Sequence, residues 1–409
     1  MHWPESKMKN MSEKILFVDD EPNVLNGLRR MLRPMRHEWE MEFVEGGPLA
    51  LNTLQKQRYD VIVSDMRMPG ISGDQLLEEV RNRYPHMVRI ILTGQCTKES
   101  GLRALRVAHR MLNKPCDPET LKLAVSSSCH LLQTLAHKSV LALVTSRETL
   151  PSLPIYYVEL LKELDAKEPS LDKLAEIIGR DVAMLAKLLH LVNSSFICHG
   201  TEVTNPKQAV TLLGLEALRH LVLTVGIFFT FKTPTDGPLS MNALLAHCQA
   251  TALIAGAIAR TERAEIRLVE LSIIAGLLHD VGKFVFLDSM PEIYRCALGR
   301  SWATNEPLAQ IEQETFGATH AEVGACLLQL WGLPTPVVEA VAWHHQPNES
   351  LTTEFCPLTA VHAANALCKK KDGGPAKLDS DYLERLNLTG RLPVWQELAE
   401  RAKSEGKIQ

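Results

Sequence analysis

The sequence lacks the features that mark secreted, disulfide-rich or membrane-spanning chains. Its nine cysteines are odd in number and include no CxxC pair, which favours reduced thiols over a disulfide framework. No apolar segment follows the N-terminus, so no signal peptide is predicted. The longest strongly apolar stretch, 221–231, is far shorter than the roughly 18 residues that span a bilayer. We therefore predict a cytoplasmic chain without membrane insertion.

The charge balance also lacks a strong bias. With 48 acidic and 44 basic residues the net charge is −4, whereas nucleic-acid-binding proteins are usually basic. No helix-turn-helix or basic recognition stretch stands out, so DNA binding is not expected. A hydrophobic content of 45% is ordinary for a globular protein and excludes disorder. At roughly 100–200 residues per domain, the 409 residues suffice for two or three domains.

The N-terminal third alternates short apolar runs with amphipathic helical stretches, which is typical of a parallel α/β sheet. The apolar runs are 15–18, 41–44, 61–63, 90–92 and 111–112, and the helical stretches include 24–32, 50–57 and 75–83. We predict a doubly wound, five-stranded parallel domain over residues 14–125, after an N-terminal tail at 1–13.

Apolar residues at three-and-four spacing dominate the rest of the chain, which predicts an all-helical domain over 150–375 and a C-terminal helix or tail at 376–409. Residues 126–149 are interpreted as a helical linker between the domains. Its apolar residues either form a homodimer seam or pack on a neighbouring domain, and the pattern is too short to decide. These residues are Leu131, Leu132, Leu135, Val140, Leu141 and Val144.

Polar side chains follow the predicted strands where each one ends. Asp19 and Asp20 end the first strand, Asp65 the third and Thr93 the fourth, while Lys114 follows the fifth. Because the carboxyl ends of parallel strands meet at one edge, these groups should lie together. Clustered carboxylates suit Mg²⁺, and an aspartate can accept a phosphoryl group whose charge the metal and a lysine neutralise. The sequence thus predicts a phosphorylatable aspartate with Mg²⁺ at Asp19, Asp20 and Asp65.

The segments VDDEPNVL, VSDMRMPGISGDQLL, LTGQ and LNKPCD resemble the receiver domain of two-component response regulators. The resemblance implies that Asp65 is the phosphoacceptor, that the carbonyl of Arg67 joins the Mg²⁺ ligands, and that Thr93 and Lys114 contact the phosphoryl group. It also implies a cognate sensor histidine kinase as partner. Receivers usually carry an aromatic residue three positions before the lysine; Met111 stands there, so the coupling to the output face should differ in detail.

Three residues around Lys114, namely His109, Arg110 and Cys116, are expected at the surface.

A set of histidines marks the helical half. Imidazoles together with a carboxylate suit iron, manganese or zinc, which can make a hydroxide nucleophile for a phosphodiester. Their long spacings require different helices of a bundle to assemble the site. The residues are His247, His279, Asp280, His320, His344 and His345.

The segments at 150–154, 177–196, 209–224, 275–286, 319–334 and 340–347 resemble the HDOD module, an output domain related to the HD phosphohydrolases. The resemblance implies output by interaction with an unknown downstream protein. The histidine set falls where the related cyclic-di-GMP phosphodiesterases, called HD-GYP, keep metal ligands or nearby site residues.

Two departures from the hydrolytic relatives favour the binding interpretation. No GYP follows His344–His345, and Asn365 stands where the superfamily has a later aspartate ligand. A metal-dependent phosphodiesterase, with Lys283 stabilising phosphate charge, is the alternative. A degenerate site that binds a cyclic dinucleotide without hydrolysis is a third possibility, and hydrogen-bonded structural histidines are a fourth.

Overall fold

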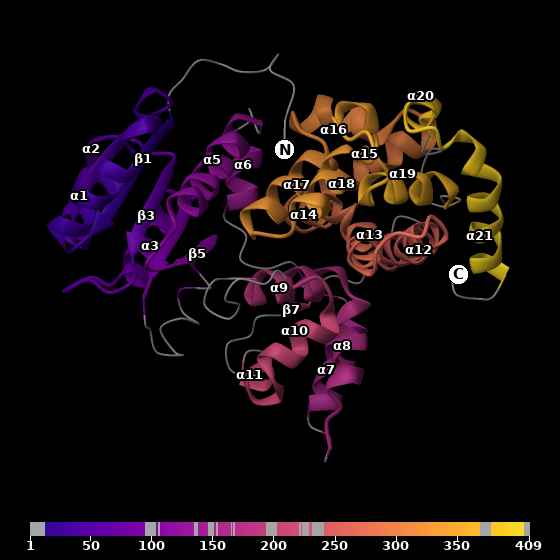
Figure 1. Cartoon of the computed structure of the whole chain (residues 1–409), viewed down its shortest axis with the longest axis horizontal. Coiled ribbons are helices and arrows are strands. Elements are labelled where there is room, and N and C mark those ends of the chain that lie inside the picture. Colours follow the sequence, from indigo (N-terminus) through magenta and orange to yellow (C-terminus); the bar gives the residue numbers. More distant parts are fainter. Residues whose placement is uncertain are drawn as a thin grey trace.

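The computed structural model describes residues 13–94, 104, 107–134, 138–145, 151–152, 154–164, 166, 168–193, 203–220, 222, 229–230, 241–368 and 378–404. An α/β domain occupies one side of the molecule, and helices fill the other side (Figure 1). The predicted fold class is confirmed.

The N-terminal domain is built on a five-stranded parallel sheet of order β2-β1-β3-β4-β5. The strands are β1 (Glu13–Asp19), β2 (Trp39–Glu45), β3 (Val61–Asp65), β4 (Val88–Thr93) and β5 (Arg110–Asn113). Every residue of β3 and β4 is buried, as expected for central strands covered by helices on both faces. The five apolar runs therefore became the five strands.

Helices α1 (Pro22–Met31), α2 (Gly47–Lys56), α3 (Gly73–Arg83) and α5 (Pro118–Thr134) accompany the sheet, with a 3₁₀ turn at η2 (Arg33–His37). A capping box between Ser72 and Gln75 begins α3. A Cβ on Gly73 would lie 2.1 Å from the carbonyl oxygen of Asp65. Glycine is thus required where α3 starts against the end of β3.

The linker contains the end of α5 and a separate helix, α6 (Lys138–Thr145). Val140, Leu141 and Val144 are buried, and α6 packs against helices α14 and α17 of the second domain. These three residues therefore take the intramolecular alternative. The side chains of Leu131 and Leu132, and all of Leu135, lie outside the described residues, so a homodimer stays a prediction.

The helical region confirms the second half of the fold class. Its helices are α7 (Pro154–Leu164), α8 (Leu171–Gly179), α9 (Val182–Val192), α10 (Pro206–Leu213), α11 (Leu215–His220), α12 (Met241–Thr261), α13 (Ile266–Leu278), α14 (Val281–Ser289), α15 (Pro291–Thr304), α16 (Leu308–Phe316), α17 (His320–Leu330), α18 (Thr335–Trp343), α19 (Pro357–Leu367), α20 (Ser380–Arg385) and α21 (Leu392–Ser404). Short 3₁₀ turns, η4 (Pro347–Glu349) and η5 (Thr389–Arg391), and two-residue strands, β6 (Pro151–Ser152) and β7 (Phe229–Thr230), complete it.

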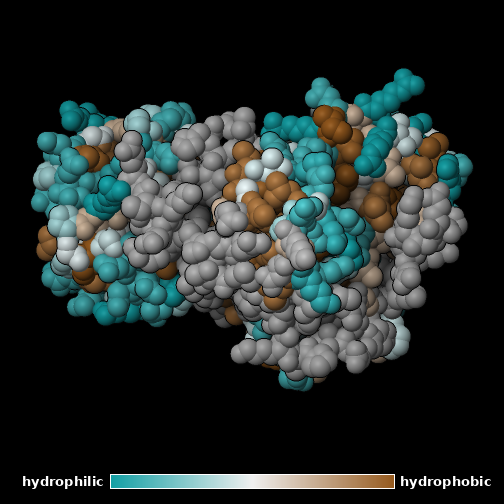
Figure 2. Space-filling view, turned by 90° about the horizontal axis from the view of Figure 1, so that it is seen from below, coloured by the Kyte–Doolittle hydropathy of each residue, from teal (hydrophilic) through white to brown (hydrophobic). Residues whose placement is uncertain are grey.

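Helix α12 contains a stretch, Ala243–Thr261, that by length and composition could cross a membrane, with a mean hydropathy of 1.3. It packs against α13 and α19, and 56% of the stretch is buried. The apolar side chains of α12 therefore contribute to the core of the helical domain. On the face shown in Figure 2, hydrophilic side chains cover much of the α/β domain, and several apolar groups lie among hydrophilic ones on the helical domain.

Helices α14 and α17 approach each other through glycine. A Cβ on Gly282 would lie 2.0 Å from the carbonyl oxygen of His320 and 2.9 Å from the amide nitrogen of Gly324. Both are backbone atoms, which cannot rotate away as a side chain does. This contact brings the start of α14 against the start of α17, where several of the predicted site residues lie.

Gly282→Ala should lower the free energy of unfolding by about 3 kcal/mol, because the added methyl group forces the two backbones apart. Gly299→Ala, in α15, is the matched control: nothing lies within 4 Å of its Cβ position. That variant should be stabilised by roughly 0.5–1 kcal/mol, the helix-interior cost of glycine relative to alanine. Urea unfolding of both variants beside the parent measures the difference; equal stability would contradict the close approach.

Candidate functional site

The first site lies at the carboxyl edge of the parallel sheet. The ammonium of Lys114 lies 2.6 Å from Asp19 Oδ2 and forms a second ion pair with Asp65 Oδ1. Asp20 is exposed at the same edge, and Thr93 is buried at the end of β4. The strand ends thus bring the predicted residues to one edge, as the sequence indicated.

Backbone groups orient the two carboxylates. The amide of Glu21 donates to Asp19 Oδ1 at 2.9 Å, and the amide of Arg67 donates to Asp65 Oδ2 at 2.6 Å. Burial raises the pKa of Asp65, against the opposing effects of Lys114 and of the Arg67 amide. Burial lowers the pKa of Lys114, but its two aspartate partners outweigh it and leave that pKa raised. The lysine therefore stays charged beside the carboxylates.

The prediction that His109, Arg110 and Cys116 lie at the surface is wrong. His109 is buried, and Arg110 and Cys116 are half-buried. For His109 the reason is that α6 folds back over the edge of the sheet, and for Arg110 it is a contact with Gln329 of α17. His109 Nε2 lies 2.7 Å from the carbonyl oxygen of Thr145, the last residue of α6.

A buried arginine in β4 was missed. Arg89 is 1% exposed, and its guanidinium donates to the carbonyl oxygens of Met87, Val107 and Thr145 at 3.1, 2.7 and 2.9 Å. Because all three are neutral acceptors, burial lowers the pKa of Arg89 to about 9. The sequence does contain one sign of this buried group, because Arg89 is the single charged residue in the apolar run VRIIL.

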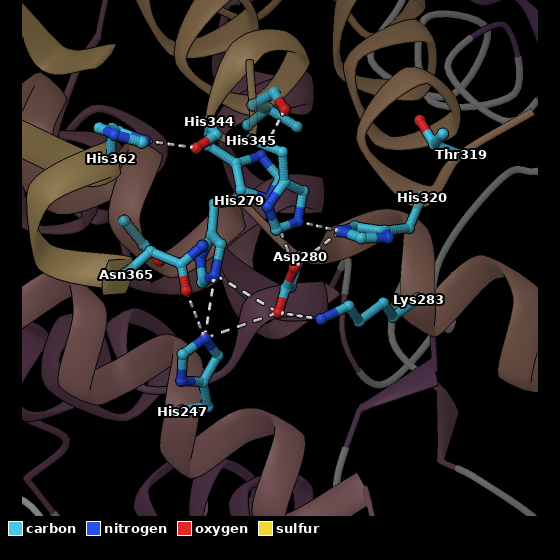
Figure 3. A network of polar contacts seen from close by, with 12 residues as sticks. His247, His279, Asp280, Lys283, Thr319, His320, His344, His345, His362 and Asn365 are labelled. Carbon is cyan, nitrogen blue, oxygen red and sulfur yellow. Dashed lines mark hydrogen bonds and ion pairs between the residues drawn. The ribbon is translucent and has the colours of Figure 1, made fainter. Parts of the chain in front are cut away.

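The second site is a buried cluster of histidines around one carboxylate (Figure 3). Six helices and the turns at their ends supply its members. They are His247 in α12, His279 at the end of α13, Asp280 and Lys283 at the start of α14, His320 at the start of α17, His344 and His345 after α18, and Asn365 in α19.

Asp280 is at the centre of this cluster and is fully buried. Its Oδ2 atom lies 2.6 Å from Lys283 Nζ, 3.4 Å from His279 Nε2 and 3.7 Å from His247 Nε2. Its Oδ1 atom lies 3.2 Å from His320 Nε2 and 3.7 Å from His344 Nε2. The carboxylate thus divides the histidines into two sets, one at each oxygen.

Outward hydrogen bonds fix the ring tautomers. His279 Nδ1 lies 2.7 Å from the carbonyl oxygen of Gly276, and His344 Nδ1 lies 2.8 Å from that of Val341. A carbonyl only accepts, so both Nδ1 atoms carry the proton. Burial holds the pKa of His344 well below its usual range, so its ring is neutral and its Nε2 presents a lone pair to the centre. Acceptors of His344 and Asp280 therefore face each other.

Two of these inward atoms, Asp280 Oδ1 and His344 Nε2, are buried without a hydrogen-bond partner in the described part of the chain. Burial raises the pKa of Asp280, but His279 and Lys283 outweigh it and hold that pKa well below its usual range. Burial also holds the pKa of His344 well below its usual range. An ionised carboxylate and a neutral imidazole are the forms that bind a transition metal, so the residues fit one.

Two further groups of this site were missed from the sequence. Glu312, in α16, is fully buried and lies 2.6 Å from His320 Nδ1, and the hydroxyl of Tyr294 donates to it. His362, in α19, lies 2.8 Å from the carbonyl oxygen of His344. Glu312 stands beside no recognised motif, so spacing gave no signal for it, whereas His362 lies three positions before Asn365 and could have been noticed there.

Comparison with known proteins identifies the families of both domains. Residues 15–126 match the response regulator receiver domain, and residues 150–347 match the HDOD domain. The chain is a receiver–HDOD protein. Both resemblances inferred from the sequence are confirmed.

The chain is similar to several individual proteins. An uncharacterized protein of Treponema pallidum is 28% identical over 243 residues, which cover 59% of this chain and 46% of that protein. The response regulator protein FleR of Pseudomonas aeruginosa is 31% identical over 112 residues, covering 27% and 23%. This chain therefore spans less than half the length of these relatives.

Among solved structures, the MmoQ response regulator of Methylococcus capsulatus covers 61% of this chain and 98% of its own, at 22% identity and a TM-score of 0.46. The receiver domain of an HD domain-containing protein of Pseudomonas fluorescens covers 30% and 99%, at 27% identity and a TM-score of 0.29.

Proposed function

We propose that this chain is a cytoplasmic response regulator that a cognate sensor histidine kinase phosphorylates on Asp65. Mg²⁺ would bind Asp19, Asp20 and Asp65, with the carbonyl of Arg67. The observation that carries the proposal is the pairing of Lys114 with both Asp19 and Asp65. This pairing places a cation where the negative charge of an acyl phosphate on Asp65 would develop. The HDOD domain would act on an unknown downstream protein.

One route for the signal runs through β5 and α17. Lys114 follows β5 directly, and Arg110 stands at the other end of this strand. The Arg110 guanidinium donates to the carbonyl oxygen of Gln329 at 2.8 Å, in the last turn of α17. Helix α17 begins at His320, in the histidine cluster. One strand, one charged hydrogen bond and one helix thus connect the phosphorylation site with the HDOD site.

A second contact supports the same coupling. Arg89 and His109 hold the carbonyl of Thr145, at the C-terminus of α6. Cations near a helix C-terminus are favourable because the last carbonyls are unsatisfied. Helix α6 packs on α14 and α17, the two helices that carry Lys283 and His320. A shift of β4 or β5 would therefore move the helices that build the cluster.

Asp65→Asn should abolish labelling by acetyl phosphate, because the amide is no nucleophile toward phosphorus. Asp60→Asn is the control, since Asp60 precedes the opposite end of β3 and its side chain accepts from the Lys14 amide. That variant should take label like the parent. Labelling of the Asp65→Asn protein at the parent's rate would contradict the assignment.

Arg110→Met should uncouple the domains without preventing phosphorylation, because it removes the bond to Gln329 but leaves the Asp65 pocket intact. In the parent, beryllofluoride, which mimics the phosphoryl group, should change amide hydrogen exchange in α6 and α17. In Arg110→Met the change in α17 should fall at least about threefold, whereas exposed Arg83→Met should behave like the parent. An undiminished response would contradict this route.

The second candidate function is that of a metal-dependent phosphohydrolase or a nucleotide-binding relative of one. The two partnerless buried atoms in the cluster favour it. A bound metal would lower the pKa of a water and so supply a hydroxide nucleophile. His247, His279, Asp280, His320, His344 and His345 would hold it, and Lys283 would compensate the carboxylate charge. Asn365 lies beside His247, and its neutral amide would bind a metal more weakly than the carboxylate of the hydrolytic relatives.

Incubation of the metal-supplemented chain with cyclic dinucleotides distinguishes the candidates. If HDOD acts through protein contacts alone, no turnover is expected and His279→Ala should change nothing. Turnover that disappears in His279→Ala would favour the phosphohydrolase over signalling through protein contacts alone. Saturable binding without turnover would indicate a nucleotide-responsive, non-hydrolytic module.

A further inference from the structure

The two halves of the histidine cluster differ chemically. Asp280 belongs to both halves. The first group, called here the His320 half, consists of Asp280, His320, His344 and His345, and the second, the His247 half, of His247, His279 and Asp280. Potential ligand atoms within each group lie within 4.8 Å of one another.

The His247 half is hydrogen-bonded without a cation. His247 Nε2 lies 3.1 Å from Asn365 Oδ1, and an amide oxygen only accepts, so this ring nitrogen carries a proton. The same ring nitrogen lies 3.3 Å from Nε2 of His279. On this side of the carboxylate, Asp280 Oδ2 receives the ammonium of Lys283. Both of these acceptor oxygens therefore have a donor in this half.

The His320 half instead leaves two buried acceptors of the described chain without a hydrogen-bond donor. It contains Asp280 Oδ1 and His344 Nε2, the two atoms of the cluster that are buried without a hydrogen-bond partner among the described residues. His320 Nε2 also points into it, 3.2 Å from Asp280 Oδ1 and 3.1 Å from His345 Nε2. Buried acceptors that receive no hydrogen bond are unfavourable unless a cation lies beside them.

Glu312 strengthens this half from outside. Its Oε2 atom accepts from both the Nδ1 (2.6 Å) and the backbone amide (2.8 Å) of His320, and Tyr294 donates to Oε1 at 2.6 Å. The corresponding groups behind His279 and His344 are neutral backbone carbonyls. A carboxylate behind an imidazole raises the basicity of the ligating nitrogen and fixes the ring.

We propose that the HDOD domain binds a single transition-metal ion tightly, in the His320 half, and that Glu312 is the positioning residue for its ligand His320. This inference rests on the metal-binding role given above as the second candidate function. The His247 half would take a second ion only weakly, because Asn365 adds no charge and His247 must first lose its proton.

Titration of the metal-stripped, full-length chain with Co²⁺ against a competing chelator tests the proposal, because the visible spectrum of Co²⁺ also reports its coordination. The parent should bind one equivalent at least about tenfold more tightly than a second. His345→Ala should lose the tight equivalent, and its half-buried position makes folding of this variant the safest. His247→Ala should keep the tight equivalent.

Glu312→Gln tests the positioning role. The glutamine oxygen can still accept from His320, so the fold is kept while the charge is removed. The tight equivalent should weaken by about 10–100-fold, with a shifted Co²⁺ spectrum. Tyr294→Phe, which keeps the carboxylate, should have a smaller effect; a merely structural role would alter the melting temperature of both variants and leave the spectrum unchanged.

Different outcomes of these titrations would overturn different parts of the proposal. Two equivalents of equal affinity, or a tight equivalent that survives in His345→Ala, would overturn the single-ion inference while metal binding stands. Unchanged affinity in Glu312→Gln would overturn the role of Glu312. Absence of Co²⁺ binding to the parent would overturn both this inference and the phosphohydrolase candidate, and would leave receiver signalling through protein contacts.

Discussion

The helical domain depends on one buried carboxylate. Asp280 is completely removed from solvent and remains ionised because His279 and Lys283 stabilise its charge. Residues from α12, α14, α17, α18 and α19 converge on it, and Gly282 lets α14 approach α17 closely enough for this to happen. The need to satisfy both oxygens of one carboxylate therefore sets how these helices meet, and the Oδ1 side is the part that protein groups leave incomplete.

The same helices join the two domains. The receiver domain presents cationic or polar side chains to helix C-termini, half-buried Arg110 to α17 and buried Arg89 with His109 to α6. Such contacts are stiff, because an uncompensated buried guanidinium would cost more than a small shift of the helix. A phosphoryl group that changes the Lys114 end of β5 would thus act on the end of α17 opposite to His320. Met111, in place of the usual aromatic residue, is buried inside this same strand and offers no ring to swing outward.

Much of this arrangement could be predicted from the sequence. Strands and their terminal Asp19, Asp65 and Lys114 were predictable because a parallel sheet fixes where its strand ends meet. The histidine set was recognisable from its motifs, although long spacings hid which rings face which oxygen of Asp280. Glu312, Tyr294 and Arg89 were missed. Each lies on an ordinary helix or apolar strand, and each acquires its role only from a partner that is distant in sequence. His109 was placed at the surface because the return of α6 over the sheet edge leaves no local pattern.

The most direct test is to measure the metal content of the chain purified without oxygen, beside that of the double variant His279→Ala, Asp280→Ala. It shows whether the cluster around Asp280 binds a metal ion. The account predicts about one equivalent of iron, manganese or zinc in the parent, and none in the double variant. Equal metal content in both proteins, or none in the parent although the histidines are intact, would contradict it.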